Sequence, residues 1–215
     1  MKNSFETAAL ALSTFAAFAL GAVSATAATF SLDKGQLGEA VEHGKAHFEQ
    51  HPTAFRWNYM TDLGYGYPTV LMRTEYLAVS DYVRRAEFQR KYGSQRAHKL
   101  TDERIENARV EVDGQLQFLV TLYGPEANFV DNFEFHLMAN GKEMKPAYVD
   151  KPVMGENSGF KGKLAYTATV IIDFPTKDLK GDEKVTLVID PPDGLGPSGS
   201  RNSNFEAPFD LSAVM

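Results

Sequence analysis

Hydrophobic and polar side chains alternate in the second half of the chain, in runs that recur between residues 115 and 211. A period of two puts every second side chain on the same face of a β-strand, so one face of each run is expected to be buried. Asn140-Gly141 lies between two strand-like segments and is a strong hairpin signal, with residues 143–149 as the returning strand. The alternating hydrophobic positions are Leu116, Phe118, Val120 and Leu122; Phe133, Phe135, Leu137 and Ala139; Tyr166, Ala168, Val170, Ile172 and Phe174; Val185, Leu187 and Ile189; and Phe205, Ala207, Phe209 and Leu211.

The first half of the chain follows a helical period instead. Apolar residues three or four positions apart predict an amphipathic helix over residues 36–50, which Pro52 ends because the residue before a proline is biased away from helical dihedrals. Residues 76–92 and 101–107 are also predicted to be helical, and residues 69–72 fit a short strand. The apolar positions of the first helix are Leu37, Val41, Gly44 and Phe48.

Six short strands separated by turns are typical of an antiparallel β-sandwich. The turn at residues 179–182, Leu-Lys-Gly-Asp, feeds an alternating strand and resembles the crossing turn of immunoglobulin-like domains. A parallel α/β fold would need helices between the strands, and the intervening stretches lack helical periodicity. We therefore predict an α+β protein, with a mainly helical N-terminal region over residues 28–107 and a C-terminal immunoglobulin-like β-sandwich over residues 108–215.

The N-terminal segment has the features of a secretory signal peptide. Lys2 precedes an apolar run at residues 8–23, and Ala-Thr-Ala at 25–27 is a small-x-small cleavage pattern, so residues 1–27 are predicted to be removed. Glu6 weakens the basic start and leaves an uncleaved N-terminal anchor as the alternative. We expect an exported protein, periplasmic or extracellular, without a membrane-spanning helix once the signal is removed.

Composition excludes several kinds of chemistry. The chain contains no cysteine, which rules out disulfides, thiol nucleophiles, thiolate metal sites and covalently attached haem. A formal net charge of −6 argues against nucleic acid as a partner. The sequence carries no phosphate-binding glycine loop and no assembled set of catalytic residues, so we predict no catalytic site. Residues 84–104 are locally basic, which is interpreted as a solvated helix face.

Three of the five histidines recur every four residues, and Glu39 extends the series by one turn. Side chains at this spacing lie above one another on a helix, and two imidazoles so placed can share a Zn²⁺, Ni²⁺ or Cu²⁺ ion. The alternative is that these residues merely flank a buried apolar face. The predicted metal ligands are Glu39, His43, His47 and His51, and no other cofactor is expected.

The connection between the first predicted helix and the predicted strand at residues 69–72 is rich in aromatic residues and glycines. Tyrosine and tryptophan offer a rigid apolar face with a polar tip, which suits stacking on sugar rings or another flat ligand. The alternative places these rings at the junction of the two regions as part of the core, with Trp57 buried there. The candidate ligand-binding residues are Phe55, Arg56, Trp57, Tyr59, Tyr65 and Tyr67.

These features predict an exported, non-catalytic interaction or structural module of the bacterial cell envelope, with an envelope protein as its partner. The first alternative is a periplasmic metal or small-ligand carrier that uses His43, His47 and His51. The second alternative is a hydrolase whose catalytic residues the sequence does not identify. Fold class alone does not choose among these three.

Overall fold

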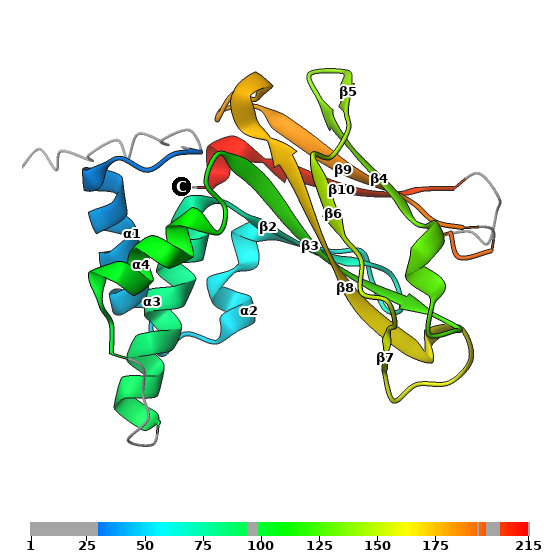
Figure 1. Ribbon diagram of the computed structural model, residues 1–215, viewed down its shortest axis with the longest axis horizontal. Helices are drawn as coiled ribbons and strands as arrows, with labels where there is room; N and C mark the ends of the chain where they lie inside the picture. Colours follow the sequence, from blue (N-terminus) through cyan, green and yellow to red (C-terminus); the bar gives the residue numbers. More distant parts are fainter. Residues whose placement is uncertain (1–29, 94–98, 193, 197–202, 215) are drawn as a thin grey trace, which may run out of the picture.

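The computed structural model describes residues 30–93, 99–192, 194–196 and 203–214. The predicted signal peptide, residues 1–27, lies outside the described residues. Within these ranges the protein is a mixed structure of four α-helices and ten strands, with the helices gathered beside two antiparallel sheets (Figure 1). None of the helices in these ranges is both long enough and apolar enough to cross a membrane.

Each of the three longer helices begins at a residue whose side chain caps it. Asp33 and Gln36 form a reciprocal capping box at the start of α1, and Thr74 and Thr101 accept a backbone N–H at the starts of α3 and α4. The helices are α1 Lys34–Ala46, α2 Pro52–Phe55, α3 Glu75–Tyr92 and α4 Asp102–Val110.

The first helix is shorter than the predicted range of residues 36–50. His47 forms its C-terminal cap, and His51 has left the helix to cap α2, whose first residue is Pro52. Proline is favoured at the first helical position because its missing N–H is not needed there, and it forces the preceding residue out of helical dihedrals. Pro52 therefore starts a second helix as well as preventing the first from continuing.

Helix α3 contacts both α1 and α4. It approaches α1 most closely at Gly44, where an added Cβ atom would lie 2.4 Å from the carbonyl oxygen of Ser80. This close approach explains why a glycine stands on the apolar face of α1. A separate small core joins the three helices, and it is formed by Ala40, Tyr76, Val79, Val83 and Ile105.

The first sheet has the strand order β1-β2-β3-β8-β6, and β7 also pairs with β8. Every pairing is antiparallel, and β2 pairs directly with β3 over the full length of β2. Two strands of this sheet therefore come from the mainly helical first half of the chain. The bounds are β1 Met60–Asp62, β2 Thr69–Arg73, β3 Gln115–Gly124, β6 Tyr148–Asp150, β7 Glu156–Asn157 and β8 Tyr166–Pro175.

The second sheet is also antiparallel, with the order β10-β9-β4-β5. The hairpin predicted at Asn140-Gly141 is confirmed, because β4 pairs with β5 and both turn residues have positive φ, 51° and 73°. The returning strand is shorter than the predicted residues 143–149, since β5 ends at Met144 and β6 belongs to the first sheet. Positive φ at both central positions is what a two-residue type I′ turn requires. The bounds are β4 Glu134–Ala139, β5 Lys142–Met144, β9 Lys184–Asp190 and β10 Phe205–Asp210.

The inner faces of the two sheets share one hydrophobic core. Phe118 illustrates the arrangement, since its ring centroid lies 5.9 Å from that of Phe174 in the same sheet and 5.5 Å from that of Phe209 in the other. Burial of a phenylalanine side chain contributes about 1.5–3 kcal/mol. The alternating residues expected from the sequence are buried between the sheets, except Tyr166, which is half-buried and packs against the same core, so the predicted strand periodicity is confirmed.

Candidate functional site

The outer face of the first sheet connects two hollows of the surface. On β2 the side chains of Thr69, Leu71 and Arg73 lie on this face, while the residues between them enter the core. On β3 the matching positions include Leu119 and Tyr123. One hollow lies at the Thr69 end and the other at the Arg73 end. Thr69 and Arg73 are four positions apart along the strand, which corresponds to about 13 Å.

The hollow at the Thr69 end is an aromatic groove, here called the tyrosine groove. Two adjoining cavities of about 370 and 330 Å³ form it and share the rings of Tyr65, Tyr67 and Tyr123. Tyr65 is 79% exposed, and its ring meets that of Phe160 edge to face with centroids 5.9 Å apart. The side chains and glycines that line the groove include Asp62, Tyr65, Gly66, Tyr67, Thr69, Tyr123, Phe160, Lys163 and Leu164.

Two glycines shape the loop that carries the tyrosines. Gly64 and Gly66 have φ values of 112° and 76°, a region that residues with a side chain rarely adopt. The Gly64 N–H donates to the Asp62 carboxylate over 3.0 Å, and the Tyr67 N–H donates to the Gly64 carbonyl oxygen over 3.0 Å. The tight turn leaves Tyr65 on the surface, while the ring of Tyr67 packs 5.6 Å from that of Phe205.

The polar rim of the tyrosine groove is sparse. Asp62 and Thr69 lie on one side, and Lys163 lies on the other, where its ammonium group donates to the Gly194 carbonyl oxygen over 3.4 Å. Asp62 is the one carboxylic acid among the described residues that line either cavity. The groove therefore offers exposed ring faces with a few hydrogen-bonding groups at their edge.

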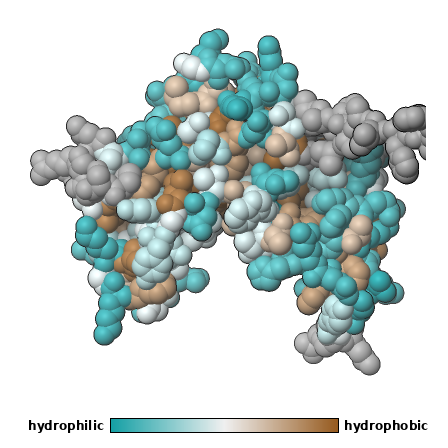
Figure 2. All heavy atoms as spheres, turned by 180° about the vertical axis from the view of Figure 1, so that it is seen from behind, coloured by the Kyte–Doolittle hydropathy of each residue, from teal (hydrophilic) through white to brown (hydrophobic). Residues whose placement is uncertain are grey.

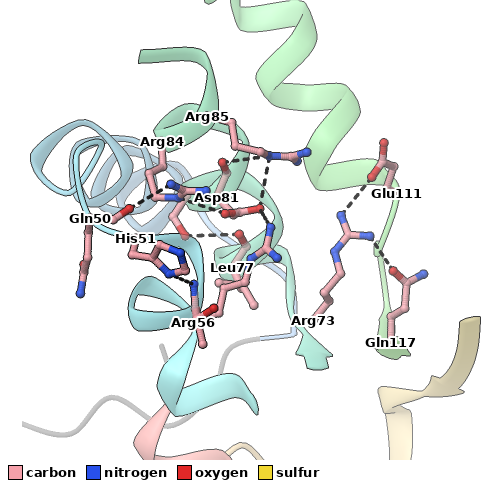
Figure 3. A network of polar contacts seen from close by, with 12 residues as sticks. Gln50, His51, Arg56, Arg73, Leu77, Asp81, Arg84, Arg85, Glu111 and Gln117 are labelled. Atoms are coloured by element: carbon pink, nitrogen blue, oxygen red, sulfur yellow. Dashed lines mark hydrogen bonds and ion pairs between the residues drawn. The ribbon is translucent and has the colours of Figure 1, made fainter. Parts of the chain in front are cut away.

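The hollow at the Arg73 end is a polar cavity of about 310 Å³, here called the arginine pocket. Arginines from three separate elements line it: Arg56 follows α2, Arg73 ends β2 and Arg85 belongs to α3 (Figure 3). Figure 2 shows that the molecule is notched between its helical part and its sheets. The residues that line the pocket are Arg56, Leu71, Arg73, Leu77, Asp81, Arg85, Glu111 and Leu119.

Asp81 is the centre of the charge network in this pocket. Its carboxylate is 2.6 Å from Arg56, 3.2 Å from Arg84 and 3.3 Å from Arg85. Burial acts to raise the pKa of Asp81, but the hydrogen bond from Arg56 and the charges of all three arginines outweigh burial and hold that pKa below its usual range. Asp81 is therefore ionised near neutral pH, although its side chain is only 9% exposed.

Arg73 belongs to a chain of polar contacts that crosses the sheet. It donates one terminal N–H to the Gln117 amide oxygen over 2.7 Å and another to Glu111 over 3.0 Å. The amide nitrogen of Gln117 in turn donates to Asp173 over 2.9 Å. These contacts hold the guanidinium of Arg73 at the mouth of the pocket.

The structure separates the six candidate ligand-binding residues. Tyr65 and Tyr67 meet in the tyrosine groove, and Arg56 enters the arginine pocket. Phe55 and Tyr59 are buried in the main core, at 7% and 9% exposure. They lie four residues apart across the end of α2 and a short 3-10 helix, and both enter the core.

Trp57 is not buried at the junction, contrary to the expectation from the sequence. Its side chain is 71% exposed. It begins the 3-10 helix Trp57–Tyr59, which follows α2 directly. Phe55 and Tyr59 occupy the inward positions on either side of it, so Trp57 points to solvent and lies outside both hollows.

Two of the four predicted metal ligands are adjacent. The rings of His43 and His47 have centroids 4.3 Å apart, and His43 also contacts the ring of Phe55 at 5.2 Å. His51 instead accepts the N–H of Thr53 as the cap of α2. Among the described residues, no three His, Asp or Glu side chains gather where they could hold a metal ion. Metal binding at the histidine pair stays a prediction.

The histidine pair has a specific electrostatic environment. Burial lowers the pKa of His43, and the neighbouring charge of His47 lowers it further. The ring of His47 also makes a 2.9 Å hydrogen bond with the His43 carbonyl oxygen at the end of α1. Both rings line a cavity of about 250 Å³ with Phe55 and Tyr76.

Sequence reasoning missed most of the residues at the two hollows. Tyr123 and Arg73 stand at outward positions of strands, where polar residues are ordinary. Arg85 belongs to the basic stretch interpreted as a solvated helix face, and Phe160 lies in a loop without any periodic pattern. The gathering of Arg56, Arg84 and Arg85 around one carboxylate appears only when α2 and α3 are placed in space.

Comparisons with protein-family models, with curated proteins and with solved structures find no match. The residues and the geometry of the two hollows are therefore the basis for its function, since a fold by itself hosts many functions.

Proposed function

We propose that the protein is an exported, non-catalytic binding module of the bacterial cell envelope, and that it binds a carbohydrate chain in the tyrosine groove. The observation that carries this proposal is the gathering of Tyr65, Tyr67, Tyr123 and Phe160 around two adjoining cavities. Three of these rings are exposed by more than a third: Tyr65 at 79%, Tyr67 at 38% and Phe160 at 47%.

The chemistry of a sugar ring suits such a groove. One face of a pyranose presents C–H groups that pack on an aromatic ring, while its hydroxyl groups point outward toward polar partners. Asp62, Thr69 and Lys163 stand at the rim in positions to accept or donate those hydrogen bonds. Tyrosine loses little conformational entropy on binding because its side chain has only two torsions, so exposed tyrosines make efficient contacts.

The same groove favours binding over hydrolysis. Glycoside hydrolysis normally uses two carboxyl groups that flank the scissile bond, about 5–10 Å apart. Asp62 is the one carboxylic acid among the described residues that line the two cavities, and it already accepts the N–H of Gly64. This composition supports recognition of a carbohydrate without cleavage.

The two sheets are proposed to form an immunoglobulin-like sandwich. Both sheets are antiparallel and share one core, and the chain passes between them after β3, after β5 and after β8. Repeated passage between two packed sheets is typical of sandwich folds.

The test of carbohydrate binding is affinity electrophoresis of the mature protein in gels that contain single polysaccharides. We expect at least one polysaccharide to retard the wild-type protein, and Tyr65→Ala to weaken that binding about tenfold or more, which corresponds to about 1.4 kcal/mol. Trp57→Ala is the matched control, because it removes a comparably exposed aromatic ring outside the groove. Equal retardation of wild type and Tyr65→Ala would show that the groove is not the binding site.

An envelope protein partner is the second candidate. The observation that favours it is a set of exposed apolar side chains at and after the edge strand β6: Tyr148 at 56%, Val153 at 86% and Met154 at 66% exposure. An edge strand offers unpaired backbone groups to another chain. A photo-crosslinking residue at position 153 should capture one discrete protein in cells, and the same residue at Glu143, exposed on β5 of the other sheet, should not.

A further inference from the structure

We infer that the arginine pocket binds the carboxylate of an acidic sugar, so that the carbohydrate of the tyrosine groove is an acidic glycan. This inference rests on the proposed function, because it assigns both hollows to one ligand. It adds the chemical class of the ligand and a second subsite, which the aromatic groove alone does not define.

The arginine pocket holds N–H donors that the described residues of the protein do not use. A guanidinium has five N–H donors. Arg85 directs only its Nε toward Asp81, and its two terminal amino groups make no hydrogen bond with any described residue. Arg56 donates one terminal N–H to the same carboxylate. Figure 3 shows the outer nitrogens of Arg85 extending past Asp81, away from the contacts drawn as dashed lines.

Local charge also favours an anion at this pocket. Three arginines and two carboxylates line it, an excess of one positive charge in a chain whose formal net charge is −6. Salt screens exposed charges beyond about 8 Å under physiological conditions, so the local excess decides what binds here. The arginines are Arg56, Arg73 and Arg85, and the carboxylates are Asp81 and Glu111.

A continuous strip of the sheet joins the two hollows. Arg73 and Thr69 point from the same face of β2, about 13 Å apart along the strand. Between them, Leu71 pairs with Leu119 of β3, and both side chains are half-buried. This apolar strip gives a chain of linked sugar rings a floor to lie on. A glycan whose ring stacks on Tyr65 thus extends across the sheet toward the arginines.

A carboxylate is the anion that the pocket is built to accept. The planar fork of arginine matches the two coplanar oxygens of a carboxylate, and Arg56 already binds one carboxylate, that of Asp81, through a single terminal nitrogen at 2.6 Å. Because arginine forks also bind phosphate and sulfate, the test includes both of these anions.

The direct test is a titration of the ¹⁵N-labelled mature protein with sodium glucuronate and with glucose. The two sugars differ at one carbon, which is a carboxylate in glucuronate and a hydroxymethyl group in glucose. The readout is the set of arginine Nε–Hε resonances. We expect glucuronate, but not glucose, to shift the Arg56 and Arg85 resonances. Arg85→Gln should abolish the shift at Arg56, and Arg90→Gln should preserve it, because Arg90 is an exposed arginine of the same helix that pairs with Glu87.

Several results of this titration would overturn the inference. Shifts no larger than those caused by the same concentration of sodium chloride would show that the pocket binds no carboxylate. Larger shifts with sodium phosphate or sodium sulfate than with glucuronate would assign the pocket to a tetrahedral anion. An unchanged response in Arg85→Gln would place the binding elsewhere.

A second measurement separates this inference from the proposed function. Affinity electrophoresis compares an acidic polysaccharide with its carboxyl-reduced, neutral form. We expect Arg85→Gln to weaken binding of the acidic form about tenfold and to leave the neutral form unchanged, while Tyr65→Ala weakens both. Equal binding of the two forms by the wild type contradicts the acidic glycan and leaves carbohydrate binding intact. If the wild type binds neither form, both the proposed function and the single ligand for the two hollows are contradicted. The glucuronate titration then shows separately whether the arginine pocket binds a carboxylate.

Discussion

Arg56 and Asp81 lie 25 residues apart in the sequence, and their side chains meet at 2.6 Å. The contact joins the end of α2 to the middle of α3 and lies at the point where the helices meet the first sheet. Asp81 also neutralises Arg84, whose side chain is 4% exposed and whose terminal N–H donates to the Gln50 carbonyl oxygen. One carboxylate therefore stabilises two arginines that come from different helices.

Replacement of Asp81 by alanine should destabilise the protein strongly. The change leaves the buried charge of Arg84 without a counter-charge, and removal of one member of a buried ion pair costs about 3–5 kcal/mol. Urea unfolding measures this loss. The control is Glu42→Ala, which breaks an exposed pair with Lys45 and should cost less than about 1 kcal/mol. Similar losses for the two variants would show that Asp81 is not a buried partner.

Acidification should weaken the fold through His43. Its pKa is lowered in the folded state by burial and by His47, so the unfolded chain takes up a proton first as the pH falls below about 6.5. The free energy of unfolding should therefore fall with decreasing pH, by at most about 1.4 kcal/mol per pH unit for one group, until the folded-state pKa is passed.

Chemical unfolding at a series of pH values between 7 and 5 measures this slope. His43→Gln should flatten it, whereas His51→Gln, which keeps His43 in place, should retain it. A slope that is the same in wild type and His43→Gln would contradict the assignment.

Substitution of Gly44 by alanine should separate α1 from α3. The new Cβ would stand 2.4 Å from the Ser80 carbonyl oxygen, a backbone atom that cannot move aside alone. Overpacking of this kind costs about 1–3 kcal/mol. Gly38→Ala is the matched control on the same helix, because nothing lies within 4 Å of its added Cβ, and it should raise stability by up to about 1 kcal/mol. Thermal unfolding distinguishes the opposite signs.

Gly66→Ala should weaken carbohydrate binding. Gly66 has a φ of 76°, and an added Cβ would lie 2.9 Å from the end of the Leu164 side chain, so Leu164, which lines the groove, or the loop that carries Tyr65 must shift. Gly114→Ala is the control, since its φ is 66° but no atom lies within 4 Å of the added Cβ. Each variant should lose about 1–2 kcal/mol of stability from the left-handed backbone, and only Gly66→Ala should lose retardation by the polysaccharide.

The periodic part of the structure was predictable because it depends on neighbouring residues. The alternation around Phe118 and Leu187 and the positive-φ pair Asn140-Gly141 act over a few positions, so the sequence indicates the strands and the hairpin directly. Strand β1 spans only three residues, Met60–Asp62, and is too short to display a period. Its place beside β2 depends on pairing with another strand and not on its own composition.

The candidate sites were less predictable because they depend on distant residues. Tyr65 and Phe160 are 95 positions apart in the chain and meet only through the folded sheet. Trp57 is exposed because a short helix turns it outward, and its size and apolar character alone suggest the opposite. The histidine series has the right spacing for a helical ladder, but α1 ends before His51.

Arg73 at the end of β2 pairs directly with Gln117 of β3, and β3 begins at Gln115, so residues 74–114 form a long excursion from a single pair of neighbouring strands. The chain leaves the sheet at the end of β2 and rejoins it beside that point at the start of β3. The length and sequence of the excursion can therefore change without altering the register of β2 and β3. Helix α3 is carried by this excursion and supplies Asp81, Arg84 and Arg85. A different insert at the same point would therefore change the residues at one end of the proposed binding face, while the aromatic end, built on the other ends of these strands, is retained.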